Sequence, residues 1–349
     1  MNPAKRGRVA IVGAGLSGLS CASTLRALGF EVRVFDKGRG PGGRTSTRRA
    51  LIGDAEVGFD HGAQYFTVRD PDLMARVQEW DRLGVVKRWR GRVAVLDSDG
   101  SVRSYSDKPR FVGTPAMSAI CKQLATGQDL RFGVRVARIA SSEGRVGLVD
   151  EHGDPLGEFD SAVCTAPPVQ TVDLVAEAAP ELARRAGSVR MKPCWAVMTA
   201  FDSPLDVPYD GAFVNEGPLS WIARTSSKPS RIALPDRWVL HGSAPWSEQH
   251  LESPPERVAE QLLAALFEST RRPDRAPVHL LAHRWRYAIA DNPLEEGCLY
   301  DETTRIGACG DWAFGNRVEG AILSGVAMAR RIAEPAERGP RPRCSSPWS

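Results

Sequence analysis

A glycine-rich turn stands between a predicted strand and a predicted helix at the start of the chain. The apolar, mostly β-branched run 9–12 predicts the strand, and it leads directly into Gly13-Ala14-Gly15-Leu16-Ser17-Gly18. Leucines then recur at helical spacing until Gly29, and Val32-Arg33-Val34-Phe35 predicts a second strand. This order of strand, turn, helix and strand is typical of a dinucleotide-binding unit.

The three glycines of this turn have different physical roles. Gly13 permits the tight turn, Gly15 lets the backbone approach a pyrophosphate, and Gly18 lets the helix pack closely on the strand. The helix N-terminus offers free N–H groups to phosphates, and Asp36 at the end of the second strand is placed to accept from ribose hydroxyls. The motif alone is shared by NAD and FAD proteins, so it leaves both cofactors open.

Two further segments favour FAD. Gly42-Gly43-Arg44 supplies an arginine on a flexible backbone, and Gly310-Asp311 offers a carboxylate to the ribityl chain and second phosphate. A helix predicted to start near Gly320 would direct its N-terminus at a flavin, where it favours the negatively charged reduced state. A second Gly-x-Gly-x-x-Gly that joins a predicted strand to a predicted helix is absent, which argues against a separate nicotinamide domain.

Bulk properties exclude several other classes of protein. The 349 residues suit about two domains, and the first eight and last twenty residues each contribute +3 to the formal net charge of +4. The basic excess therefore belongs to the tails and does not indicate nucleic-acid binding. No apolar stretch is long enough to span a membrane, and no signal peptide is evident, so we expect a cytoplasmic protein. The seven cysteines are widely spread without a C-x-x-C pair, which predicts free thiols, and we expect no metal site.

The remainder of the chain alternates predicted helices and short strands. The block 193–246 is rich in Val, Trp, Phe, Ile and Leu in short runs broken by Pro and Gly, which predicts an antiparallel sheet. Apolar residues at helical spacing predict helices over 72–83, 115–124, 254–267 and 320–332.

Several motifs together resemble the renalase family within the flavin amine oxidase superfamily. They are Val-Phe-Asp-Lys-Gly-Arg-Gly-Pro-Gly-Gly-Arg (34–44), Asp-His-Gly-Ala-Gln-Tyr-Phe-Thr (60–67), and the closing segment from Gly310-Asp311 to Gly325. Shorter likenesses at 111–113, 165–168, 238–241 and 284–286 extend the resemblance over about residues 8–332.

This resemblance implies an α/β fold: a Rossmann-like FAD-binding domain plus a mixed α+β substrate domain with an antiparallel sheet, in the topology of p-hydroxybenzoate hydroxylase and the amine oxidases. We expect 1–70, 107–170 and 280–333 to form the FAD-binding domain, 71–106 and 171–279 the substrate domain, and 334–349 a disordered tail. The expected contacts of a non-covalent FAD are Gly13, Ala14, Gly15, Leu16, Ser17, Gly18, Asp36, Lys37, Gly43, Arg44, Gly62, Ala63, Gln64, Val136, Gly310, Asp311, Val318, Glu319, Gly320 and Ala321.

The sequence differs from those of the amine oxidases at positions that bear on the choice of substrate. Those enzymes typically place an aromatic ring just before the Glu-Gly of the last motif, whereas this chain has Arg317-Val318, and an arginine there would repel a cationic substrate. A flavin-linking cysteine is also missing from 312–316. The resemblance therefore implies an oxidase of misreduced nicotinamides, the 2- and 6-dihydro isomers of NAD(P), with dioxygen as electron acceptor. The alternatives are an amine oxidase or other small-molecule FAD oxidoreductase, and a flavin-holding binding protein without turnover.

The residues expected to line the catalytic cavity are Gln64, Phe213, Trp221, His241 and Trp285. Their aromatic faces would stack a planar dihydropyridine against the flavin, so that proximity supplies most of the catalysis. Hydride transfer from such a substrate releases no proton and needs no general base. For His241 two interpretations stay open, a hydrogen bond within the sheet or a polar contact with the substrate carboxamide or flavin.

Overall fold

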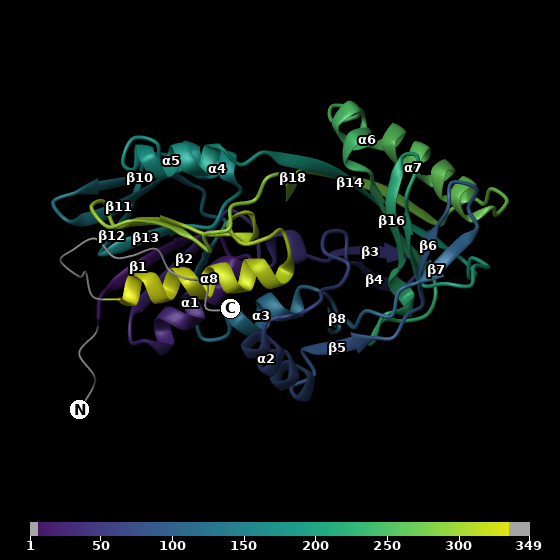
Figure 1. Cartoon of the computed structure of the whole chain (residues 1–349), viewed down its shortest axis with the longest axis horizontal. Coiled ribbons are helices and arrows are strands. Elements are labelled where there is room, and N and C mark those ends of the chain that lie inside the picture. Colours follow the sequence, from purple (N-terminus) through teal and green to yellow (C-terminus); the bar gives the residue numbers. More distant parts are fainter. Residues whose placement is uncertain (1–5, 335–349) are drawn as a thin grey trace.

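The computed structural model describes residues 6–334, in which two large sheets lie toward opposite ends of the molecule (Figure 1). The first sheet has, in order across it, β19 (Leu299–Asp301), β20 (Ile306–Ala308), β13 (Ser161–Cys164), β1 (Arg8–Val12), β2 (Glu31–Asp36) and β9 (Asp129–Phe132). Neighbouring strands are parallel except β19 and β20, which run antiparallel. The predicted strand–turn–helix–strand unit therefore lies in the middle of a parallel sheet.

Two helices from opposite ends of the chain pack together beside this sheet. They are α1 (Leu16–Ala27) and α8 (Val318–Ala333), and Figure 1 shows α8 in yellow crossing next to α1. A Cβ on Gly325 would lie 2.1 Å from the backbone oxygen of Ser17, so the absence of a side chain allows this close crossing. The shorter α3 (Ala119–Ala125) also contacts α1. The packing brings the N-terminal and C-terminal motifs to the same part of the molecule.

A second layer packs on the six-stranded sheet through a separate apolar core. It contains the antiparallel strands β10 (Val136–Ser142), β11 (Arg145–Asp150) and β12 (Pro155–Phe159), with the helices α4 (Pro168–Val175) and α5 (Pro180–Gly187). Buried residues of these elements share one core cluster with side chains of β1, β13 and β20. The helices α1 and α8 belong to a different core cluster.

The second large sheet has seven strands. In order they are β18 (His279–Ala290), β14 (Met191–Phe201), β17 (Asp236–Gly242), β16 (Leu219–Arg224), β15 (Gly211–Val214), β6 (Val93–Leu96) and β7 (Val102–Tyr105). All pairs are antiparallel except β15 with β6. The helices α6 (Ala244–Gln249) and α7 (Pro255–Thr270) pack against this sheet, and Figure 1 shows both in green beside it. The antiparallel sheet predicted for 193–246 is present.

The remaining elements connect the two sheets. The hairpin of β3 (Arg48–Ile52) and β4 (Ala55–Phe59) packs on β14 and β17, whereas β5 (Val86–Trp89) pairs with β8 (Arg110–Gly113) beside α2 (Pro71–Arg82). Asp70 caps α2, since its carboxylate accepts from the Leu73 amide at 2.8 Å. Short 3₁₀ turns are η1 (Gly43–Thr45), η2 (Thr225–Ser227) and η3 (Asp311–Ala313).

The predicted fold class is confirmed. Three segments, however, pack with a different sheet from the one that their predicted domain implies. β18 lies in the seven-stranded sheet because it pairs along most of its length with β14, although 280–333 was assigned to the FAD-binding part. The hairpin β3–β4 covers that same sheet through Val57 and Phe59. Conversely, α4 and α5 pack toward the six-stranded sheet although 171–279 was assigned to the substrate part. The predicted disordered tail lies outside the described residues, apart from Glu334.

Candidate functional site

The glycine turn has the geometry that its three positions predict. Gly13 has a φ of +115°, and a Cβ there would lie 2.3 Å from the Thr165 hydroxyl oxygen. A Cβ on Gly18 would lie 2.0 Å from the backbone oxygen of Gly13. A Cβ on Gly15, in contrast, would meet no protein atom within 4 Å. Protein atoms therefore lie close to Gly13 and Gly18, whereas the space beside Gly15 is open. That space suits a phosphate group.

Both helices that begin near the two motifs lack a side-chain cap. The cap residues are Gly15 for α1 and Arg317 for α8, and neither makes a side-chain hydrogen bond to the helix end. Glu319 in the first turn of α8 accepts instead from the backbone amides of Arg69 and Asp70, at 2.6 and 2.8 Å. Two uncapped, partly positive helix ends are thus available to an anionic or electron-rich group. Both of these bonds end on Glu319 Oε1, and contact of Glu319 with the cofactor stays a prediction.

Three of the predicted cofactor contacts, Asp36, Lys37 and Val136, lie at the end of β2 and the start of β10. The carboxylate of Asp36 accepts from the amides of Ala14 and Gly38, each at 2.6 Å, which fixes it beside the glycine turn. Lys37 is exposed, with its Nζ 3.5 Å from Gln170. Val136 is buried at the start of β10. Contact of these residues with the cofactor stays a prediction.

Arg44 and Asp311, which are 267 residues apart in the chain, form a bidentate ion pair. The two Nη atoms of Arg44 donate to Asp311 Oδ1 and Oδ2 at 2.5 and 2.9 Å, and Nη1 also donates to the Ala288 oxygen. The backbone oxygen of Arg44 accepts from the Ala63 amide at 2.9 Å. This ion pair therefore joins the loops that were predicted to surround the second phosphate and the flavin.

Close backbone approaches at Gly43 and Gly62 connect the glycine turn with the loops at the flavin end of the predicted site. A Cβ on Gly43 would lie 3.4 Å from the Gly15 Cα, and one on Gly62 would lie 2.0 Å from the Arg44 oxygen and 3.4 Å from the Trp285 ring. Gly310 donates its amide to Ser324 Oγ at 2.9 Å and so ties the last motif to α8. The arrangement fits one extended cofactor, as the two motifs predict.

Four of the five predicted catalytic residues lie on the seven-stranded sheet, and three of them are cross-strand neighbours. Phe213 pairs with Trp221, and Trp221 pairs with His241. The rings of Phe213 and Trp221 are 4.7 Å apart, and Tyr65 packs 5.3 Å from Trp221. Trp221 Nε1 is buried and has no hydrogen-bond partner among the described residues. These rings form an aromatic surface that faces the segment 60–65.

His61 is the centre of a second group of rings. Its backbone oxygen accepts from Trp285 Nε1 at 2.9 Å, and His241 Nε2 lies 3.3 Å from the same oxygen. The Trp285 ring stacks on His61 at 5.0 Å, and His283 meets His61 edge-on at 4.8 Å. His241 thus binds the loop that precedes Gly62 rather than a partner within its own sheet. Its contact with a substrate stays a prediction.

Gln64, the fifth predicted residue, belongs to a buried charged cluster. Lys228 Nζ donates to Gln64 Oε1 at 3.1 Å and lies 3.4 Å from the Asp60 carboxylate, which Arg231 also contacts at 2.8 Å. Burial alone would raise the pKa of Asp60, but the charges of Lys228 and Arg231 outweigh it and hold that pKa well below its usual range. Burial lowers the pKa of Lys228 to about 8, against the attraction of Asp60.

Sequence reasoning missed His61, Tyr65, Lys228 and Arg231 as residues of this site. His61 and Tyr65 lie within the quoted motif 60–67, so that motif could have indicated them. Lys228 and Arg231 follow η2 in the segment Ser-Lys-Pro-Ser-Arg, which has no periodicity and no recognisable spacing. Burial of a lysine depends on the folded environment and leaves no such sequence signal.

We expect the free energy of unfolding to fall as the pH drops from about 6.5 to about 4. Burial lowers the pKa of His61 and of His241 to about 4 each, whereas a histidine in an unfolded chain has a pKa near 6.5. In this window the unfolded chain binds protons that the native protein does not, so stability present above the window is lost below it, by up to about 3 kcal/mol per residue. Urea unfolding across this pH range measures the slope. His241→Asn should show a shallower slope than the unmodified protein, and equal slopes would contradict the expectation.

Other predictions concern thiols, metals and membranes. Cys21, Cys121, Cys164 and Cys309 are buried free thiols, and Cys194 and Cys298 are partly buried ones. Over residues 6–334, no cluster of three or more His, Cys, Asp or Glu side chains could hold a metal ion. No helix in that same range is both long and apolar enough to cross a membrane.

Comparison with known proteins gives two family matches and several similar proteins. Residues 11–80 match the NAD(P)-binding Rossmann-like domain, and residues 91–333 match the flavin containing amine oxidoreductases. The hydroxyneurosporene desaturase of Rubrivivax gelatinosus is 37% identical over 116 residues, which is 30% of this chain and 21% of that protein. An L-amino-acid oxidase of Bothrops moojeni is 34% identical over 119 residues, which is 31% of this chain and 24% of that protein. The chain thus matches only about a quarter or less of the length of these two relatives.

Longer matches are weaker in sequence. Mouse renalase is 22% identical over 308 residues, which cover 82% of this chain and 87% of renalase. A putative protoporphyrinogen oxidase from Exiguobacterium sp. superposes with a TM-score of 0.75 at 14% identity, covering 94% of this chain and 99% of that one. Cyclohexylamine oxidase from Brevibacterium oxydans gives a TM-score of 0.70 at 14% identity, covering 94% and 98%. These structures show the same fold. Because the second family match spans more than half of the sequence, this chain belongs to the flavin containing amine oxidoreductases, with FAD as its cofactor.

Proposed function

We propose that this protein is a renalase-like oxidase that converts 2- or 6-dihydro-NAD(P) to NAD(P)⁺. The observation that carries the proposal is the charge of the site. Lys228 and Arg231 outnumber the one buried carboxylate of the cluster, Asp60, and burial favours the neutral imidazoles of His61 and His241. Aromatic rings next to cations and neutral imidazoles suit a planar, anionic nucleotide better than an ammonium ion.

The C-terminal motif supports the same choice. Arg317 is exposed at the N-terminus of α8, at the position where the amine oxidases typically have an aromatic ring. A positive charge beside a positive helix end disfavours a cationic amine. The alignment with mouse renalase over most of both chains, together with the motifs at 34–44 and 60–67, adds support that the family match alone does not supply.

The chemistry asks the protein chiefly to orient its substrate. When bound, FAD supplies the acceptor for two electrons, which then reduce dioxygen to hydrogen peroxide. A dihydropyridine that loses a hydride breaks one C–H bond and becomes an aromatic pyridinium without releasing a proton. Over the whole reaction the dihydronicotinamide, one proton and dioxygen give NAD(P)⁺ and hydrogen peroxide.

The residues of the site can perform this orientation. Phe213 and Trp221 present ring faces for stacking, and the unpartnered Trp221 Nε1 is a donor for a carboxamide oxygen. Trp285 and His241 both contact the His61 backbone oxygen, which holds these side chains in place beside the Phe213 and Trp221 rings. Proximity then accounts for most of the rate, and this hydride transfer needs no general base.

Anaerobic mixing of the holoenzyme with 6-dihydro-NAD or 6-dihydro-NADP tests the proposal. We expect rapid bleaching of the oxidised flavin band, followed by recovery of the band and one hydrogen peroxide per substrate after air is admitted. The ordinary 4-dihydro isomer and a panel of primary and secondary amines serve as comparison substrates. Bleaching by amines, with none by the 2- or 6-dihydro isomers, would overturn the proposal and favour an amine oxidase.

A further inference from the structure

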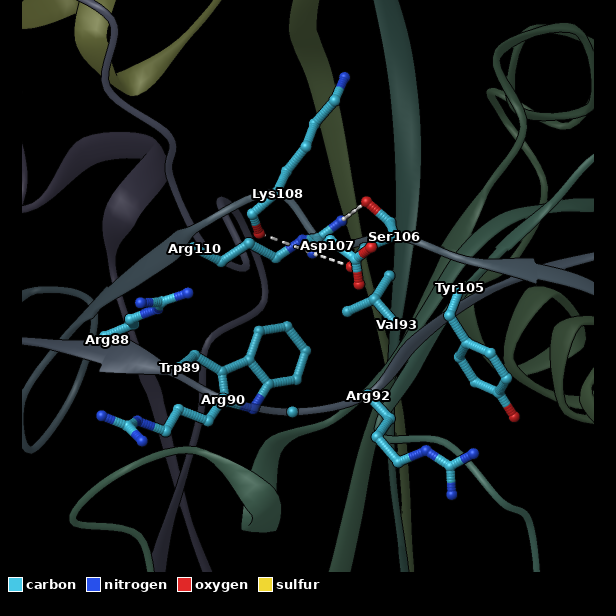
Figure 2. A pocket seen from close by; sticks show the side chains of 11 residues that line it. Arg88, Trp89, Arg90, Arg92, Val93, Tyr105, Ser106, Asp107, Lys108 and Arg110 are labelled. Atoms are coloured by element: carbon cyan, nitrogen blue, oxygen red, sulfur yellow. Dashed lines mark hydrogen bonds between the residues drawn. The ribbon is translucent and has the colours of Figure 1, made fainter.

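A basic pocket lies where β5 and β8 meet β6 and β7. Its volume is about 450 Å³, which is in the range of small-molecule sites. Figure 2 shows the cationic side chains around it, with Trp89 among them. The cations are Arg88, Arg90, Arg92, Lys108 and Arg110, and the one acidic residue of the lining is Asp107. We use the name basic pocket for this site.

The cationic side chains of the basic pocket form no ion pair within the described residues, although the Asp210 carboxylate accepts from the backbone amide of Arg92 at 2.9 Å. Arginines elsewhere on the surface do form ion pairs. Arg110 is only 4% exposed, and its Nη atoms donate to Ser106 and to the Lys108 oxygen, while its buried Nε has no partner. Positive charge that the fold itself does not neutralise indicates a site for an anion.

Aromatic rings lie among the cations. Arg92 lies over the Tyr105 ring at 4.7 Å, and Arg110 lies over the Tyr65 ring at 5.0 Å. Arginine side chains can pair with a phosphate in bidentate fashion, and Tyr105, the exposed ring of the lining, can stack a base or a sugar. A group that carries phosphates on a nucleoside satisfies both features.

Trp89 is the wall that the basic pocket shares with the candidate active site. Its Nε1 donates to Ser227 Oγ at 3.2 Å, and the Lys228 Nζ lies 5.9 Å from its ring. The Tyr65 ring lies 6.2 Å from Trp89 and packs on Trp221 as well. In addition, β6 borders the pocket and pairs with the strand that carries Phe213. The Trp89 ring thus lies between the basic pocket and the buried contact of Gln64 with Lys228.

We propose that the basic pocket binds the phosphate groups of a dinucleotide substrate while its dihydronicotinamide end lies against Phe213 and Trp221. This inference rests on the proposed function and names the part of the substrate that gives affinity. It predicts that the enzyme distinguishes a dinucleotide from a phosphate-free riboside by the charge of the phosphates. Arg88 and Arg92 are the residues to replace, because their side chains are exposed and their removal leaves the hydrophobic core unchanged.

Two measurements on the holoenzyme test the inference. The first compares kcat/KM for 6-dihydro-NAD and for 6-dihydronicotinamide riboside. In Arg88→Ala/Arg92→Ala the ratio of the two values should fall by at least roughly tenfold, because each lost charge-assisted contact is worth about that factor. The matched control is Arg103→Ala, which removes a charge from β7 outside the pocket lining and should keep the ratio. A ratio unchanged in the double variant would overturn the inference.

The second measurement does not depend on turnover. Calorimetric titration of the oxidised holoenzyme with ADP-ribose should show binding that weakens with salt and is lost in Arg88→Ala/Arg92→Ala but not in Arg103→Ala. Equal binding by all three proteins, or none by the unmodified one, would overturn the inference. If dihydronicotinamides fail to reduce the flavin while ADP-ribose binding still requires Arg88 and Arg92, the proposed function is wrong and the phosphate site remains.

Discussion

Gly15→Val is expected to abolish FAD binding while leaving the fold intact. The backbone at Gly15 is extended, with φ −82° and ψ −176°, so any L-residue can adopt it, and a Cβ there meets no protein atom within 4 Å. The added side chain would instead occupy the space that a pyrophosphate needs beside the uncapped end of α1. Loss of two or more charge-assisted hydrogen bonds should weaken FAD binding at least about 100-fold. Gel filtration followed by a visible spectrum and flavin titration of the apoprotein measures the effect.

Two further variants separate cofactor loss from misfolding. Gly147→Val makes the same change at another glycine with no protein atom within 4 Å of its Cβ, in β11 and away from the turn, and should retain FAD. Gly18→Val places its Cβ 2.0 Å from the backbone oxygen of Gly13 and should reduce the yield of folded protein itself. A Gly15→Val protein that purifies with a full complement of flavin would show that the phosphates lie elsewhere.

The turn at Gly13–Gly18 was predictable because its signal is local. A strand, three glycines at fixed spacing and a helix constrain one another within a short stretch, so both the conformation and the ligand class follow from neighbouring residues. The C-terminal helix was predictable for the same reason, although it begins at Val318 rather than near Gly320. The antiparallel sheet of 193–246 followed from short apolar runs between Pro and Gly.

Features that depend on distant pairings were not predictable. Nothing in the sequence near Arg44 indicates that its guanidinium would pair with Asp311, or that Glu319 would bind the amides of Arg69 and Asp70. The predicted boundary at 280 assigns β18 to the FAD-binding part, whereas β18 pairs with β14 of the seven-stranded sheet, because a strand pattern does not state which sheet the strand joins. Periodicity reports which face of an element is buried, whereas the partner on that face comes from the whole fold.

Asp60→Asn is expected to be the most destabilising single change among the polar residues of the site. Asp60 is 1% exposed, and it is the carboxylate that faces both Lys228 and Arg231, whose side chains are 0% and 4% exposed. Asparagine keeps the shape and can still accept from the Thr47 hydroxyl and the Met117 amide, but it leaves two buried cations without a counter-charge. Breaking a buried ion pair in this way costs about 3–5 kcal/mol. Urea unfolding of the holoprotein, monitored by tryptophan fluorescence at neutral pH, measures the loss.

Charge, rather than the hydrogen bonds alone, should account for most of this cost, and two companion variants decide the point. Thr47→Val removes one neutral donor to Asp60 at 2.7 Å and should cost only about 1 kcal/mol. Adding Lys228→Met to Asp60→Asn removes one of the unpaired cations together with its desolvation penalty, so the double variant should regain part of the stability lost by Asp60→Asn. If Asp60→Asn costs no more than Thr47→Val, or if the double variant is less stable than Asp60→Asn, the cluster is held by packing and hydrogen bonds and the charge of Asp60 contributes little. With the expected result, the low pKa of Asp60 and the burial of Lys228 against Gln64 have a single cause, the mutual neutralisation of charges beneath the candidate active site.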